Sequence, residues 1–216
     1  KRQFNLDARV GKPQVVFRET VLGAGQATST FDRTHEEKRV FGRVTVGVEC
    51  SPRADGVVFE SVCDKPFLEG EILEAAKDGA MGIVRSGPLN GYQMDDVKIR
   101  LIDAEFMEGA SDPIAYRIAA TEAARLACEE AGPTLMEPIM AVEVSVVEAN
   151  LGDAISSINE RKGSVSEMFS RGNRRVVKAH VPLRRMFGYS TDLRTRTQGR
   201  GVFMMTFSHY DIAKGE

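Results

Sequence analysis

The stretch Ile139-Met-Ala-Val-Glu-Val-Ser-Val146 organises the second half of this 216-residue chain. Its valines occupy alternate positions, which puts them on one side of an extended backbone and predicts a half-buried β-strand. Apolar residues then recur at helical spacing, at Leu151, Ala154, Ile155 and Ile158. Asn150 is placed to cap the start of this helix, and Gly163 lies just past its end. The segment therefore predicts a strand followed by a helix.

The elements expected downstream complete one domain. Residues 165–169 and 175–181 have the composition of short strands, and the turn residues Gly172 and Asn173 between them predict a hairpin. Apolar side chains at helical spacing over residues 183–193 predict a second helix that ends near Gly199, and residues 202–207 predict a last strand. The order β-α-β-β-α-β is that of a ferredoxin-like domain.

The first half is less regular. Residues 14–21, 40–49, 57–62 and 97–102 predict strands, with a polar loop between the first two. A helix over residues 72–83 contains Gly79 and Gly82, which each cost about 1 kcal/mol relative to Ala unless they permit close packing. A longer helix begins at Asp112-Pro113 and stops at Gly132-Pro133. We take that stop as the boundary between two domains of an α+β protein.

Charge is distributed unevenly between the halves. Residues 1–133 hold 17 Lys and Arg against 22 Asp and Glu, a net of −5, whereas residues 134–216 hold 12 against 9, a net of +3. Residues 160–200 alone hold 11 basic and 3 acidic residues, a net of +8. Such a density is expected of a surface that meets a phosphate backbone. Solvated helix faces would give the same count.

The composition excludes several protein classes. No apolar run is long enough to cross a membrane, and the N-terminus is unlike a secretory signal. The three cysteines are widely spaced without a C-x-x-C motif, so we expect reduced thiols in a cytoplasmic protein. The histidines, His35, His180 and His209, lie far apart in the sequence, and we expect no metal site.

Three segments in one order carry a family resemblance: Leu135-Met-Glu-Pro-Ile-Met140, residues 182–194, and Thr197-Gln-Gly-Arg-Gly201. Together they resemble the C-terminal end of translation elongation factor G, the ribosomal translocase. The similarity extends upstream through Ser86-Gly-Pro-Leu-Asn-Gly-Tyr92 and residues 11–20. It implies that residues 13–134 correspond to the fourth domain, which resembles ribosomal protein S5 domain 2, and residues 135–216 to the ferredoxin-like fifth. Residues 1–12 would end a preceding domain that this chain lacks.

The resemblance also implies what is missing. No G-x-x-x-x-G-K-[ST] phosphate loop occurs in the sequence, so we expect the fragment to be no enzyme and to have no cofactor, with GTP and magnesium bound by the parent GTPase. The implied partners are the rRNA of both ribosomal subunits, together with tRNA and mRNA at the decoding site.

Two loops match the family's decoding-site tip, over residues 35–42 and 105–112. Within them, the implied contact residues are His35, Glu36, Glu37, Lys38, Arg39, Phe106, Met107 and Glu108. The typical first loop reads Gly-Gly-Arg-Gly-Gln-Tyr-Gly, of which only the final aromatic-glycine pair remains here. In the second loop Met107 stands where the family has a histidine. These departures favour a divergent paralogue; the alternative is that Met107 packs against Phe106 or Phe41 and the tip works by shape.

The basic segment supplies the expected rRNA contacts, because arginine can bind phosphate oxygens with two parallel donors. These residues are Arg171, Arg174, Arg175, Lys178, Arg194, Arg196 and Arg200. The leading hypothesis is the ribosome-binding part of a GTP-dependent translocase. The alternatives are a non-translocating recycling or ribosome-protection factor of the same build, and a stand-alone RNA-binding module.

Overall fold

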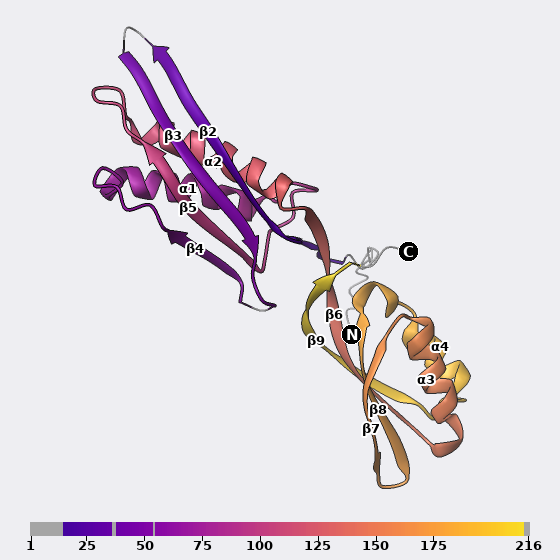
Figure 1. Cartoon of the computed structure of the whole chain (residues 1–216). Helices are drawn as coiled ribbons and strands as arrows, with labels where there is room; N and C mark the ends of the chain where they lie inside the picture. The colour runs from indigo at the N-terminus through magenta and orange to yellow at the C-terminus, as the bar shows by residue number, and fades with distance from the viewer. Residues whose placement is uncertain (1–14, 36–37, 54, 214–216) are drawn as a thin grey trace, which may run out of the picture.

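The computed structural model describes residues 15–35, 38–53 and 55–213, and it contains two sheet-based domains of mixed α+β type. In the first domain the strand order is β2-β3-β5-β4, with β4 and β5 parallel. Its elements are β2 Ala24–His35, β3 Lys38–Cys50, β4 Val57–Ser61, α1 Gly70–Arg85, β5 Val97–Glu105 and α2 Pro113–Glu130. Figure 1 shows the β2–β3 hairpin at the end of this domain farthest from the second one.

The core of the first domain follows from strand alternation and from small residues on α2. Val44, Val46 and Val48 on β3 are fully buried and share a cluster with the alanine-rich face of α2. Helices α1 and α2 approach closely because of Gly79, where an added Cβ would lie 2.2 Å from the Arg117 carbonyl oxygen. Nothing lies within 4 Å of the same position at Gly82. Close packing therefore explains one of the two helix glycines.

Strand β2 corrects the prediction of a polar loop upstream of residue 40. It pairs with β3 along its whole length, from Ala24 opposite Glu49 to His35 opposite Lys38. The polar side chains that suggested a loop include Thr28, whose hydroxyl lies 2.7 Å from that of Thr45 across the pair. Threonine is β-branched and favours strands, so polarity alone was a poor guide at this half-exposed edge.

The second domain has the predicted β-α-β-β-α-β order, and its four long strands are arranged β9-β6-β8-β7. Its elements are β6 Pro133–Val146, α3 Leu151–Glu160, β7 Ser164–Arg171, β8 Arg174–Pro182, α4 Tyr189–Arg196 and β9 Val202–Ile212, with 3₁₀ turns at Glu148–Asn150 and Leu183–Arg185. In Figure 1 both helices cover the same face of the sheet. The valines of residues 142–146 point into the core beneath them, as predicted.

Two details of this domain differ from the sequence expectation. The single helix expected from residue 183 is a 3₁₀ turn followed by α4, because Gly188 has φ 77° and interrupts the helical backbone. Asn150 does not cap α3 with its side chain. Its amide nitrogen instead lies 3.5 Å from the Arg196 carbonyl oxygen, a weak contact at best.

Strand β1, Arg18–Val21, joins the two domains. It pairs with residues 133–136 of β6, and Glu19 also forms a parallel bridge with Met94. The Glu19 carboxylate is buried and accepts hydrogen bonds from the backbone N–H groups of Leu89, Asn90 and Tyr92, at 2.8, 2.8 and 3.0 Å. The loop after α1 is therefore folded around a carboxylate from β1, which satisfies a charge that burial would otherwise make costly.

Within the described residues, none of the helices combines the length and apolar composition that crossing a membrane requires. The three cysteines are free: Cys50 is exposed, Cys63 half-buried and Cys128 buried. Burial raises the pKa of the Cys128 thiol to about 12, so this sulfur is an unreactive part of the core.

Candidate nucleic-acid interface

The tip of the first domain is built from the end of the β2–β3 hairpin. His35 is the last residue of β2, and Lys38 and Arg39 are the first residues of β3, while Glu36 and Glu37 lie outside the described residues. The loop expected over residues 35–42 is therefore wrong in extent, because residues 38–42 continue the strand. Pairing up to His35 opposite Lys38 carries the hydrogen-bonded ladder almost to the turn.

The second tip segment is a turn tied to β3. The Phe41 N–H donates to the Ala110 carbonyl at 2.8 Å, and the Asp112 N–H donates to the Phe41 carbonyl at 3.3 Å. These bonds bring the two predicted tip segments side by side. An added Cβ at Gly42 would lie 2.6 Å from the backbone of Ala115. Any residue larger than glycine at position 42 would therefore clash with the first turn of α2. This geometry accounts for the glycine at position 42.

Met107 and Phe106 have different surroundings within that turn. The Met107 N–H donates to Ser111 Oγ at 2.9 Å, and its carbonyl accepts from the Ala110 and Ser111 N–H groups at 3.1 and 2.9 Å. Its side chain is half-buried. The Phe106 ring is 51% exposed and its centroid lies 5.2 Å from that of Phe67. The backbone at Met107 is thus held in place, and Phe106 presents an aromatic surface to solvent.

Lys38, Arg39 and Arg43 at the tip are paired with acids. Arg39 donates Nε and Nη2 to the two carboxylate oxygens of Asp32 at 2.9 and 2.6 Å, and this bonding lowers the pKa of Asp32. Arg43 Nη1 lies 3.0 Å from Glu105. Lys38 lies 3.9 Å from Asp112. An exposed cation that the sequence did not single out, Arg33 on β2, has no ion pair among the described residues.

Most of the cations in residues 160–200 are also paired with acids that lie close to them in the fold. Arg171 binds Glu143 at 3.0 Å, Arg175 lies 3.4 Å from Glu148, and Lys178 binds Glu167 at 2.9 Å. Glu143 and Glu148 lie outside residues 160–200, so the local charge of +8 overstated the positive potential. Arg174 donates to two backbone carbonyls, those of Ser145 and Arg200, at 3.1 and 3.0 Å.

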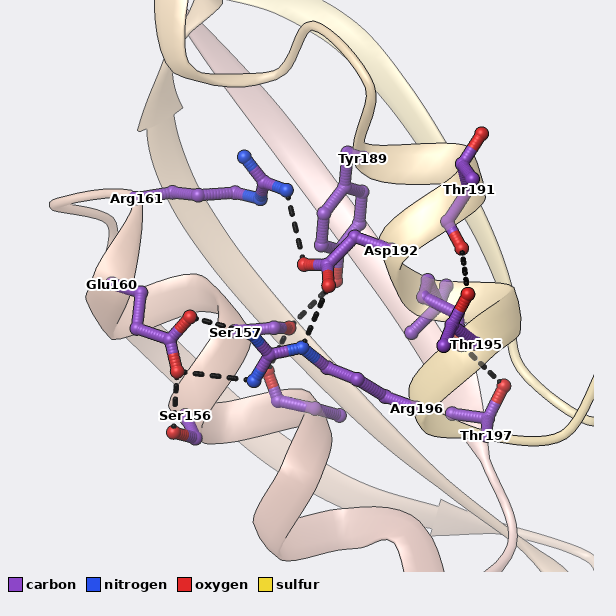
Figure 2. Close-up of polar contacts among 12 residues, drawn as sticks. Ser156, Ser157, Glu160, Arg161, Tyr189, Thr191, Asp192, Thr195, Arg196 and Thr197 are labelled. Atoms are coloured by element: carbon purple, nitrogen blue, oxygen red, sulfur yellow. Dashed lines mark hydrogen bonds and ion pairs between the residues drawn. The ribbon is translucent and has the colours of Figure 1, made fainter.

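Arg196 lies at the centre of a polar network between α3 and α4 (Figure 2). Its guanidinium binds both carboxylate oxygens of Glu160 on α3, at 3.0 and 2.6 Å, and Asp192 on its own helix, at 2.8 Å. Arg161 binds the other oxygen of Asp192 at 3.0 Å, and its guanidinium carbon lies 5.1 Å from the centre of the Tyr189 ring. Hydrogen bonding to Arg196 lowers the pKa of both carboxyl groups. The network fastens the two helices together.

Arg194 and Arg200 differ from the rest of the set. Both are exposed, and neither has an ion pair within the part of the chain that the structure describes. The turn between them is closed by hydrogen bonds: the Gly199 N–H donates to the Arg194 carbonyl at 2.8 Å, and Thr197 Oγ1 donates to the Leu193 carbonyl at 2.6 Å and accepts from the Gly201 N–H at 2.8 Å. Of the seven predicted contacts, these two are the cations most available to a phosphate.

Two family models match the chain in sequence order. Residues 13–132 match "Elongation factor G, domain IV", and residues 134–216 match "Elongation factor G C-terminus". The chain belongs to the elongation factor G family. The resemblance carried by the three C-terminal motifs is thereby confirmed, and with it membership of a family of translation elongation factors.

Two curated elongation factors G and one solved structure are similar to this chain. Elongation factor G of Aquifex pyrophilus is 38% identical over 98% of this chain, and elongation factor G 2 of Syntrophus aciditrophicus is 40% identical over 97%. A crystal structure from Thermus thermophilus superposes with a TM-score of 0.80 over 93% of this chain, at 27% identity. The chain spans 30% of the Aquifex protein, 31% of the Syntrophus protein and 30% of the Thermus chain.

Sequence reasoning about this elongation factor G family member missed one spatial relationship. His180 and His209 are far apart in the sequence, but their ring centroids lie 5.7 Å apart in an edge-on arrangement. His180 is opposite Ala141 and His209 opposite Ile139, so the rings meet across β6. Only the sheet order could reveal this pair. No group of three or more His, Cys, Asp or Glu among the described residues is arranged to hold a metal ion.

Proposed function

We propose that this chain is the ribosome-binding C-terminal part of an elongation factor G-like GTPase that promotes translocation of tRNA and mRNA. The observation that carries the proposal is the consecutive match of both family models, over residues 13–132 and 134–216. GTP and magnesium would be bound by the remainder of the parent protein. The fragment itself would position the factor on the ribosome and would take no part in catalysis. It would act in the cytoplasm.

In this proposal the tip of the first domain meets tRNA and mRNA at the decoding site. The β2–β3 hairpin projects from the domain (Figure 1), and the turn after β5 is bonded to it through Phe41. A hairpin braced in this way can transmit force along its length, because its strands are continuously paired from Ala24 to His35. Phe106 and Arg33 would be available at the surface for stacking and phosphate contact.

The second domain would dock on rRNA through the hydrogen-bonded turn that carries Arg194 and Arg200. Exposed arginines on a preorganised backbone suit phosphate binding, since the backbone loses little conformational entropy when the contact forms. Arg171, Arg175, Lys178 and Arg196 would contribute less, because each already binds a carboxylate.

A second candidate function is ribosome recycling or protection by a factor of the same build. The tip chemistry favours it: the resemblance places Met107 where the family has a histidine, and Arg39 is bound to Asp32. Such a tip could displace a ligand by its volume without forming specific hydrogen bonds to RNA.

Single-turnover translocation by the full-length parent protein distinguishes these functions. A translocase should move tRNA and mRNA on pre-translocation ribosomes in a GTP-dependent reaction, and removal of residues 13–216 should abolish movement. Release of tRNA or subunit splitting without mRNA movement would instead support the second candidate.

A further inference from the structure

A small cavity of about 150 Å³ opens beside the histidine pair in the second domain. His180, His209, Lys162 and Arg185 line it, and they come from β8, β9, the turn after α3 and the 3₁₀ turn after β8. The volume is well below that of sites for drug-sized ligands, which begin at roughly 300 Å³. The cavity therefore suits a compact ion-sized group.

The charges around this cavity favour an anion. Glu137 and Asp211 also line it, but Arg184 Nε binds Glu137 at 2.7 Å and Arg53 Nη2 lies 3.5 Å from Asp211. Lys162 and Arg185, in contrast, have no ion pair with any acid in the described parts of the chain. Two uncompensated cations therefore face the same space.

The paired imidazoles strengthen that preference. Both rings line the cavity, and each imidazole can donate an N–H to an oxygen of a bound anion. Ser208 Oγ lies 2.9 Å from His209 Nδ1, which leaves the other ring nitrogen of His209 for a ligand.

We propose that this cavity binds a phosphate group, separately from the rRNA contacts assigned to Arg194 and Arg200. Lys162 and Arg185 would supply the charge, and the two imidazoles would donate hydrogen bonds to its oxygens. The phosphate could belong to a small phosphorylated molecule or to an RNA backbone. The inference does not depend on the proposed function, because the binding concerns this chain alone.

Nuclear magnetic resonance of the histidine side chains tests the proposal. The 216-residue chain is titrated with inorganic phosphate at constant pH and ionic strength, with chloride as the reference anion. We expect saturable shifts of the His180 and His209 resonances. Shifts that never saturate, or that chloride reproduces, would overturn the proposal.

Charge-matched variants locate the site. Lys162→Gln with Arg185→Gln should weaken phosphate binding by about tenfold or more, whereas Arg85→Gln with Arg117→Gln, which removes the same charge from the first domain, should leave it nearly unchanged. Equal weakening in both would contradict a specific cavity. Competition then identifies the source: displacement of phosphate by pyrophosphate but not by a short single-stranded RNA indicates a small ligand, and displacement by the RNA indicates a backbone phosphate.

Discussion

Arg196 on α4 binds Glu160 on α3 through two hydrogen bonds, from Nη1 to Oε1 at 3.0 Å and from Nη2 to Oε2 at 2.6 Å. The same guanidinium binds Asp192 at 2.8 Å. Arg196, which the charge pattern predicted to bind rRNA, thus helps to hold the two helices of the second domain together. Charge reversal at Arg196 would confuse loss of RNA binding with loss of structure, so tests of the two roles need different residues.

Asp192→Asn should destabilise the second domain by on the order of 1–2 kcal/mol, because it weakens charge-assisted hydrogen bonds to both Arg161 and Arg196. Urea unfolding of the 216-residue chain measures the change. Asp153→Asn, an exposed substitution in the first turn of α3 without a partner in the network, is the control and should alter stability by less than about 0.5 kcal/mol. Equal effects would show that the network contributes little.

Acid should loosen the same network. The pKa values of Asp192 and Glu160 are lowered in the folded state by hydrogen bonds to Arg196, so the folded chain binds fewer protons than the unfolded chain does. Their contribution is therefore present above the ordinary carboxyl values of about 4 and is lost as the pH falls through the lower folded values. Unfolding free energies measured between about pH 5 and pH 3 should fall more steeply for the wild type than for Asp192→Asn. Parallel curves would contradict this.

The two glycines of α1 should respond oppositely to alanine. Gly79→Ala would place a methyl group 2.2 Å from the Arg117 carbonyl oxygen and should destabilise the first domain by about 1–3 kcal/mol through overpacking. Gly82→Ala meets open space and should stabilise by about 0.5–1 kcal/mol through helix propensity. Thermal unfolding of both variants checks the pair. Stabilisation by both would mean that α2 can move away from α1 at little cost.

Arg194→Glu with Arg200→Glu should weaken ribosome binding by about tenfold or more and reduce its salt dependence, since each lost phosphate contact lowers the slope of log affinity against log salt by roughly 0.7–0.9. Filter binding across a salt series measures both quantities. Arg85→Glu with Arg117→Glu changes the net charge equally in the first domain and serves as the control. If both pairs behave alike, binding follows net charge and not the turn of residues 197–201.

Met107→His in the full-length parent should raise the rate of single-turnover translocation without altering GTP hydrolysis. A hydrogen bond regained with RNA is worth about 1–3 kcal/mol, or roughly ten- to a hundredfold if it forms only in the transition state. Glu108→His, one residue further along the same turn, is the matched control. A Met107→His protein that is slower than wild type would show that the tip acts through its shape.

The sequence pattern predicted helices, strands and turns correctly where interactions between residues close in the sequence determine the structure. Alternating valines over residues 142–146, the Asp112-Pro113 helix start and the turn at Gly172 all correspond to elements of the structure, because capping, turn geometry and strand alternation act between near neighbours. Together with three ordered motifs, these patterns predicted both the family and the ferredoxin-like order.

Tertiary structure decided which charges are free and which distant residues meet. Glu143 neutralises Arg171 from 28 positions away, Glu19 orders residues 89–92 from about 70 away, and His180 meets His209 across β6. Each relationship depends on strand order and register, which are set by the burial of whole sheet faces and have no signature in a local window. The sequence by itself determined the family, the domain type and most elements, and the fold determined which basic residues are paired with acids.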